Sequence, residues 1–180
     1  MRYILTCLTV VLGLLGSAHA QQNPPCCLQT LGEINASGTK SFVAAEKFRE
    51  GETTGGVSVY SLGRFFKSNF LNKTETNVAD VTLHIRVLKK DSSDTMIRNE
   101  LGSAAEIKLA NFWNLLKRQE AGHDKTSRIV AYVRDAKGVL WTMYGYWDAN
   151  FDGWYIDAIP RSTESAHGVM WPAGYIVGSN

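Results

Sequence analysis

The chain has 180 residues, 44% of them hydrophobic, and a formal net charge of +2. This length suits one domain with a sizeable core. The 19 Lys and Arg are nearly balanced by 17 Asp and Glu. Because nucleic-acid-binding domains normally carry a clustered basic excess, we do not expect this protein to bind nucleic acid.

The first 20 residues have the composition of a secretory signal peptide. Arg2 provides a positive start, residues 4–15 are mostly apolar, and residues 18–20 have the small-x-small pattern that signal peptidase recognises. We therefore predict cleavage after Ala20 and export to the periplasm or the medium. No later stretch has about 18 apolar residues, so we expect a soluble mature chain without a transmembrane segment.

Two adjacent cysteines, Cys26 and Cys27, remain after the leader. Neighbouring residues are too close together for an ordinary disulfide between them. They lie in an N-terminal arm that we expect over residues 21–40, with a possible short helix at residues 28–34. The two cysteines are either free thiols or form an intermolecular disulfide that joins two chains into a homodimer.

Residues 41–180 are predicted to form a single α+β domain. Residues 41–49 fit either a helix or a strand, and residues 57–60 alternate like a strand. A short helix is expected over residues 65–71, where phenylalanines recur at helical spacing. Residues 79–88 alternate strictly between apolar and polar side chains, which is typical of a half-buried antiparallel strand.

A long amphipathic helix is predicted from about Asp94 to Ala121. Asp91 to Asp94 can supply its N-cap, and Gly122 suits the position after its end. We expect its apolar stripe to pack on the sheet. The stripe consists of Ile97, Leu101, Ala105, Leu109, Trp113 and Leu116.

The last third of the domain is predicted to be a three-strand meander at residues 128–134, 139–147 and 154–159. Asp135 to Gly138 has the composition of a hairpin turn. Residues 169–171 and 175–177 are each expected either to add a short edge strand or to pack across the sheet. The predicted fold is therefore α+β, with one antiparallel sheet that ends in this meander and packs on one long helix.

Strand parity divides the aromatic residues of the meander between two faces. Trp141, Met143, Gly145 and Trp147 share one face of their strand, and we expect that face to meet the long helix. The opposite face is expected to point outward and to contact a partner. Its residues also fit cross-strand pairs that only stabilise the sheet. They are Thr142, Tyr144, Tyr146, Tyr155 and Asp157.

The turn that follows matches the first half of a calcium loop, with Asp148, Asn150 and Asp152 at alternate positions and Gly153 after them. The twelfth position of such a loop needs a bidentate Glu, and here it is Ile159. Asp, Asn and Gly are also the usual residues of hairpin turns. Calcium is therefore the single candidate cofactor, with an ordinary turn as the alternative.

The sequence has no P-loop, no G-x-G-x-x-G, no G-x-S-x-G and no H-E-x-x-H motif. Our leading hypothesis is a small exported binding protein that contacts a protein partner through the aromatic face. One alternative is a secreted hydrolase that uses a carboxylate and one of His84, His123 and His167. Another is a carbohydrate-binding module with a cation-stabilised turn at residues 148–153.

Overall fold

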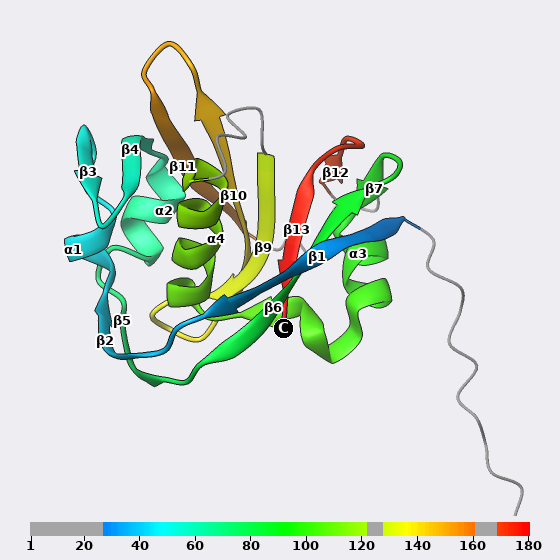
Figure 1. Ribbon diagram of the computed structural model, residues 1–180, viewed down its shortest axis with the longest axis horizontal. Coiled ribbons are helices and arrows are strands. Elements are labelled where there is room, and N and C mark those ends of the chain that lie inside the picture. The colour runs from blue at the N-terminus through cyan, green and yellow to red at the C-terminus, as the bar shows by residue number, and fades with distance from the viewer. Residues whose placement is uncertain (1–26, 122–127, 161–168) are drawn as a thin grey trace, which may run out of the picture.

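The computed structural model describes residues 27–121, 128–160 and 169–180, without the side chain of Glu120 (Figure 1). The predicted signal peptide, together with Cys26, His123 and His167, lies outside these residues. Within the described ranges, no helix has both the length and the apolar character needed to span a bilayer.

One mixed sheet dominates the described part of the chain (Figure 1). Three of its strand pairs are parallel, namely β11 with β4, β13 with β9, and β8 with β9. The predicted purely antiparallel sheet is therefore wrong. The strands lie in the order β1 (Leu28–Ala36), β6 (Val81–Leu88), β13 (Ile176–Ser179), β9 (Arg128–Arg134), β10 (Leu140–Asp148), β11 (Gly153–Pro160), β4 (Val57–Leu62) and β3 (Glu52–Thr54), and β8 (Glu106–Ile107) pairs with β9.

Short elements surround this sheet. Strand β2 (Thr39–Val43) pairs with β5 (Thr74–Val78), and β7 (Ser92–Ser93) pairs with β12 (Met170–Trp171). The helices are short, so the prediction of one long helix is also wrong. They are α1 (Ala44–Lys47), α2 (Arg64–Asn69), α3 (Asp94–Leu101), the 3₁₀ turn η1 (Gly102–Ala105) and α4 (Leu109–Ala121).

The predicted long helix is broken at Gly102, whose φ of 58° lies in the left-handed region that favours glycine. The backbone then forms η1, and β8 pairs with β9 before α4 begins. The apolar stripe therefore belongs to two different cores. Ile97, Leu101 and Ala105 pack with Tyr132 in one cluster, whereas the stripe residues of α4 belong to the other.

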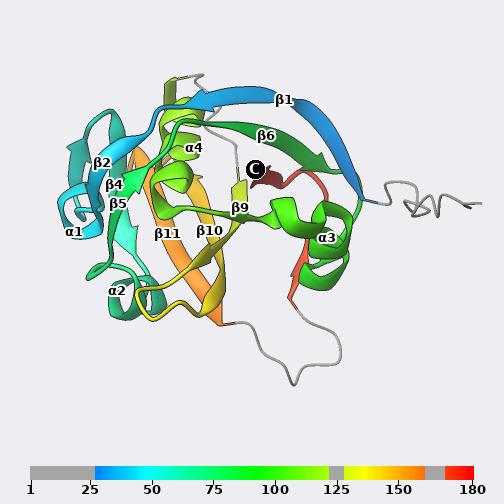
Figure 2. The ribbon, with the colours of Figure 1, turned by 90° about the horizontal axis from the view of Figure 1, so that it is seen from below.

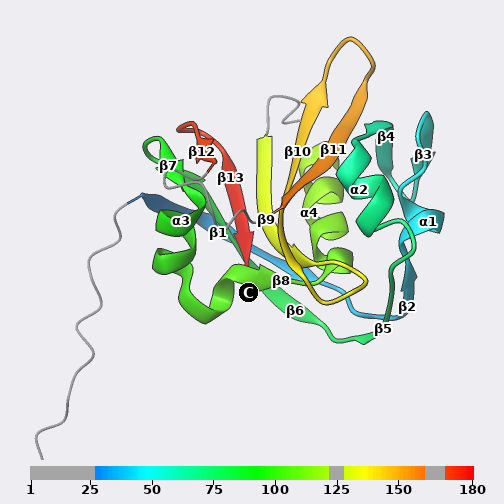
Figure 3. The same cartoon turned by 180° about the vertical axis from the view of Figure 1, so that it is seen from behind.

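The two cores lie on opposite faces of the sheet. The larger one surrounds α4, because the sheet curves from β1 and β6 on one side of this helix to β9, β10 and β11 on the other (Figure 2). The smaller core lies beneath α3 and β12, on the face that is turned toward the viewer in Figure 3. Strand β9 is central and contributes to both cores, with Ile129 in one and Val130 in the other.

The N-terminal arm and the tail also differ from prediction. Residues 28–34 form part of β1 instead of a helix, and β1 pairs with β6 from Leu28 opposite Leu88 to Ala36 opposite Val81. Tail strand β13 is an interior strand between β6 and β9 instead of an edge strand. The strands predicted at residues 57–60 and 79–88 and the three-strand meander are confirmed, and the ambiguous residues 41–49 contain both β2 and α1.

A buried carboxylate fixes the start of α4. Glu75 on β5 is 7% exposed, and its carboxylate accepts the N–H of Leu109 at 3.0 Å and of Ala110 at 2.9 Å. Lys73 Nζ lies 2.9 Å from the same carboxylate. The first N–H groups of a helix have no partner within the helix and attract negative charge. Glu75 therefore ties α4 to the β2–β5 pair.

We predict that Glu75→Gln lowers the free energy of unfolding by about 2–3 kcal/mol, because an amide retains a single acceptor oxygen and leaves the Lys73 ammonium without its counter-charge. Urea unfolding monitored by circular dichroism measures the change. The matched control is Glu46→Gln on the exposed side of α1, for which a change within about 0.5 kcal/mol is expected. Equal effects of the two substitutions would contradict the capping role.

Candidate functional site

The structure confirms that alternate residues of the meander strands lie on two opposite faces, as predicted. Trp141, Met143 and Trp147 are buried in the core that surrounds α4, together with Trp154 and Ile156 of the next strand. The residues predicted for the other face do share that face. In the β10–β11 register, Tyr144 lies opposite Asp157 and Tyr146 opposite Tyr155.

The second face is covered in part, so the prediction that it points outward is wrong for Thr142 and Asp157, which are 3% and 8% exposed. Thr142 is covered by α3 and β12, which Asp94 in the first turn of α3 joins to the sheet. The Asp94 carboxylate accepts hydrogen bonds from the Thr142 hydroxyl at 3.0 Å, from Trp171 Nε1 at 2.7 Å and from the Tyr132 hydroxyl at 3.2 Å. Asp94 thereby fastens α3 and β12 to the sheet.

Asp157 fixes the start of α2. Its carboxylate accepts the Phe66 N–H at 2.9 Å and lies 3.5 Å from the Tyr155 hydroxyl, which donates to it. The contact with α2 depends on Gly63, because a Cβ atom there would lie 1.9 Å from the Asp157 carboxyl carbon. Asp157 is therefore a structural support beneath the tyrosines instead of a directly accessible contact residue.

This face carries a continuous series of aromatic rings, which we call the aromatic stripe. Phe151 stacks on Tyr60 with ring centroids 4.6 Å apart and an interplanar angle of 11°. Successive rings along the stripe are 5.0–6.2 Å apart, within the range of favourable aromatic pairs. In the order of their contacts, its members are Phe151, Tyr60, Tyr155, Tyr144, Trp171 and Tyr175, and Tyr146 stacks on Tyr155 beside this series.

The stripe is assembled from β4, β10, β11, β12 and the turns beside them (Figures 1 and 3). Trp171 is buried beneath it, the tyrosines are half-buried, and Phe151 is 64% exposed. Sequence reasoning identified Tyr144, Tyr146 and Tyr155 but missed the other members. A local signal existed for Tyr60, which alternates with buried Val57 and Val59 in its strand, but the pairing of β4 with β11 was unknown.

Three tyrosines of the stripe, Tyr60, Tyr144 and Tyr155, have raised pKa values. Burial, followed by the hydrogen bond with Tyr146 and the charge of Asp148, raises the pKa of Tyr60 to about 12. Burial also raises the pKa of Tyr144, together with the neighbouring Tyr155 and Asp157. The pKa of Tyr155 is raised by burial and then by the Asp157 charge. At physiological pH these hydroxyls can therefore donate hydrogen bonds.

The turn at residues 148–153 presents Phe151 to solvent. Its backbone is closed by two hydrogen bonds to Asp148, from the Asn150 N–H to the carboxylate at 2.9 Å and from the Phe151 N–H to the carbonyl at 3.2 Å. Asp152 adopts a left-handed φ of 47°. Within the described ranges, no three His, Cys, Asp or Glu residues are grouped as metal ligands. Calcium binding at Asp148, Asn150 and Asp152 stays a prediction.

A groove of about 270 Å³ lies at the Phe151 end of the stripe, between the β3–β4 hairpin and the β10–β11 turn. One wall carries Glu52, Thr53, Ser58 and Tyr60, and the other carries Phe151 and Asp152. The groove thus joins two aromatic rings to two carboxylates and two hydroxyls.

The other sequence candidates lie elsewhere. Cys27 is 1% exposed, and its thiol donates a 3.0 Å hydrogen bond to Glu100, so an intermolecular disulfide through Cys27 would require local opening. His84 Nδ1 lies 3.0 Å from Glu33 Oε1 in a cross-strand pair between β1 and β6. This pair is partly exposed and remote in the sheet order from the stripe. The other two histidines of the hydrolase hypothesis, His123 and His167, lie outside the described residues.

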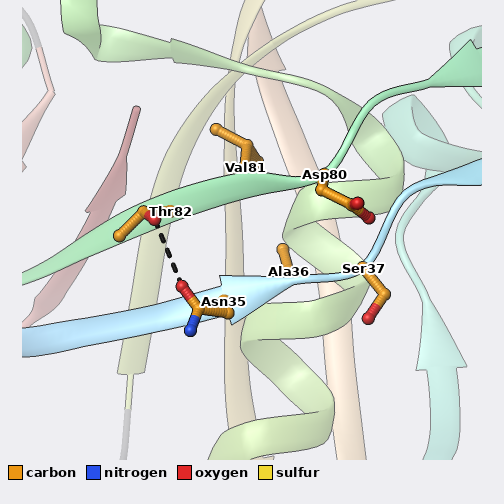
Figure 4. A pocket seen from close by; sticks show the side chains of 6 residues that line it. All are labelled: Asn35, Ala36, Ser37, Asp80, Val81 and Thr82. Carbon is orange, nitrogen blue, oxygen red and sulfur yellow. Dashed lines mark hydrogen bonds between the residues drawn. The ribbon is translucent and has the colours of Figure 1, made fainter.

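Two further concavities have polar walls. One of about 360 Å³ lies where β1 ends and β6 begins (Figure 4), and there Thr82 donates to Asn35 and Asp80 accepts the Gly38 N–H. Another of about 730 Å³ lies beside the start of α4, where the Glu75 carboxylate accepts the helix N–H groups. Their described linings contain no His or Cys.

Comparisons of the chain with protein-family models, curated proteins and solved structures find no match. The functional proposal below therefore depends on the geometry of the aromatic stripe.

We predict that Gly63→Ala destabilises the protein by about 3 kcal/mol or more, because the new Cβ overlaps the Asp157 carboxylate and forces it away from the start of α2. Urea unfolding measures the loss. Gly145→Ala is the matched control, since its Cβ would meet its nearest neighbour at 3.4 Å. A Gly63 variant as stable as the Gly145 variant would contradict the close approach of α2 to β11.

We predict that the unfolding free energy falls as the pH rises from about 10 toward 12. The unfolded chain loses tyrosine protons near pH 10, whereas folded Tyr60 keeps its proton up to about pH 12, so the unfolded state is increasingly favoured across this window. Tyr60→Phe removes this proton and should make the fall shallower. Urea unfolding at several pH values tests it, and identical pH slopes for both proteins would refute the assignment to Tyr60.

Proposed function

We propose that this chain is an exported binding protein that engages a protein partner through the aromatic stripe. The supporting observation is the unbroken series of ring contacts from the exposed Phe151 to the half-buried Tyr175. The export part of the proposal depends on the signal-peptide pattern of residues 1–20.

The chemistry of the stripe suits an interface. Tyr, Trp and Phe are enriched in protein contact surfaces because each buries a large apolar area and loses few rotatable bonds. The tyrosine hydroxyls add hydrogen-bond donors to this apolar surface. Such a surface can bind through apolar contact and still fix the orientation of its partner.

The stripe is also held rigidly before any partner arrives. Asp157 accepts from the Tyr155 hydroxyl, and Asp94 holds Trp171 under the ring of Tyr144. A preordered surface loses less conformational freedom on binding and therefore keeps more of its contact energy as affinity. Because the stripe extends across several strands instead of forming one small platform, it favours a protein surface over a single sugar ring.

The test is capture of partners from the extracellular and periplasmic proteins of the source cells, followed by affinity measurement with the purified partner. Phe151→Ala and Tyr146→Ala should each weaken binding about tenfold or more, and circular dichroism at the assay temperature should show that both variants are folded. Leu31→Ala and Val139→Ala are matched controls, because these side chains are 57% and 52% exposed and lie off the stripe.

Equal affinity of the stripe variants and the two controls would refute the proposal. Displacement of the captured material by free sugars, with the same dependence on Phe151, would instead identify a carbohydrate as the ligand.

A further inference from the structure

Two segments of the chain have the Asn-x-Ser/Thr sequence that N-glycosylating enzymes recognise in exported proteins. They are Asn-Ala-Ser at residues 35–37 and Asn-Lys-Thr at residues 72–74. Because so short a pattern also arises by chance, its meaning depends on where the structure places it. The asparagine and the hydroxyl residue of each segment are exposed, so both segments lie on the surface.

The side chain of Asn35 is oriented in a way that suits glycosylation. Asn35 lies near the end of β1, opposite Thr82 of β6. The Thr82 hydroxyl donates a 3.2 Å hydrogen bond to the Asn35 amide oxygen, and the amide nitrogen is turned away from Thr82 (Figure 4). A sugar is attached to this nitrogen, whereas the oxygen stays an acceptor. Asn35 can therefore carry a sugar and keep its contact with Thr82.

A sugar at this position would also protect an edge of the sheet. Strand β1 is the first strand in the order of the described sheet, and its Leu31 side chain is 57% exposed. An uncovered edge strand offers its backbone groups to strands of other molecules. A glycan is bulky and hydrophilic, so at Asn35 it would hinder such pairing.

The two segments differ in the residue that lies two positions before the asparagine. Some N-glycosylating enzymes require an acidic residue there in addition to the Asn-x-Ser/Thr sequence. For Asn35 this residue is Glu33, whose side chain is 56% exposed. For Asn72 it is the fully buried Phe70. Asn35 is therefore an acceptor for both types of enzyme.

Building on the export that is part of the proposed function, we propose that Asn35 is N-glycosylated in the mature protein. The donor is a lipid-linked oligosaccharide diphosphate, and an oligosaccharyltransferase of the host membrane catalyses the transfer. The Asn35 nitrogen forms a bond to the anomeric carbon of the sugar and releases one proton. The bond from that carbon to the diphosphate oxygen breaks, and the lipid diphosphate leaves with the electron pair.

Mass spectrometry of the protein that the source cells export tests this proposal. Trypsin cleaves after Lys and Arg, and the first of these residues after Ala20 is Lys40. One peptide, residues 21–40, therefore contains both the predicted mature N-terminus and Asn35. This peptide should be heavier by the mass of a glycan, and fragmentation should locate the sugar on Asn35.

Three variants, each expressed in the source cells, locate the modification. Ser37→Ala removes the hydroxyl that the enzyme recognises, leaves Asn35 in place and should abolish the mass increase. Ser37→Thr keeps a hydroxyl at the same exposed position and should retain it. Asn72→Gln is the remote control and should leave the sugar on Asn35 unchanged.

A peptide that begins at Gln21 but carries no sugar would overturn the glycosylation and leave the proposed function intact. A sugar-free chain that retains residues 1–20 would refute the export part of that function as well. A sugar that persists in the Ser37→Ala variant would overturn the assignment to the Asn-Ala-Ser segment.

Discussion

Carboxylates on strands hold the starts of helices that are distant in the sequence, and the architecture depends on this interaction. Glu75 accepts the first N–H groups of α4, and Asp157 accepts an N–H of α2. Half-buried Asp94, in the first turn of α3, accepts hydrogen bonds from donors on the sheet and on β12 and so fastens α3 to both. In each case a charged group satisfies several N–H or O–H donors at once, which offsets its desolvation on burial. The helices are thereby fixed at defined places on a curved sheet.

The same carboxylates determine what the sheet exposes. Because α3 and β12 cover one part of the second face, Thr142 is buried there and Trp171 forms the base of the stripe. Because Asp157 turns toward α2, it supports Tyr155 from below. Between these covered parts lie the half-buried tyrosines of the stripe. Its position is therefore a result of helix docking as much as of strand alternation.

Sequence patterns predicted what is local and failed where distant segments meet. Alternation in residues 128–160 placed the meander and divided its two faces correctly, since neighbouring antiparallel strands need only a turn. The apolar stripe from Ile97 to Leu116 kept its helical period across Gly102, so periodicity alone could not separate two helices that face opposite cores. The parallel pairing of β4 with β11 and the insertion of β13 left no local signal.

The stripe shows the same limit. Tyr144, Tyr146 and Tyr155 could be found because they share one face of a hairpin, whereas Tyr60 and Tyr175 reach the stripe through non-local pairing. Without Tyr60 and Tyr175, the face would have only a few cross-strand aromatic pairs, which stabilise a sheet. With them, the rings form a continuous series that ends in exposed Phe151 beside a groove. Internal sheet stabilisation accounts for the half-buried rings, and stacking on Tyr60 fixes the ring of Phe151 at the end of the series. In the binding function that we propose, contact with a partner would bury this exposed ring.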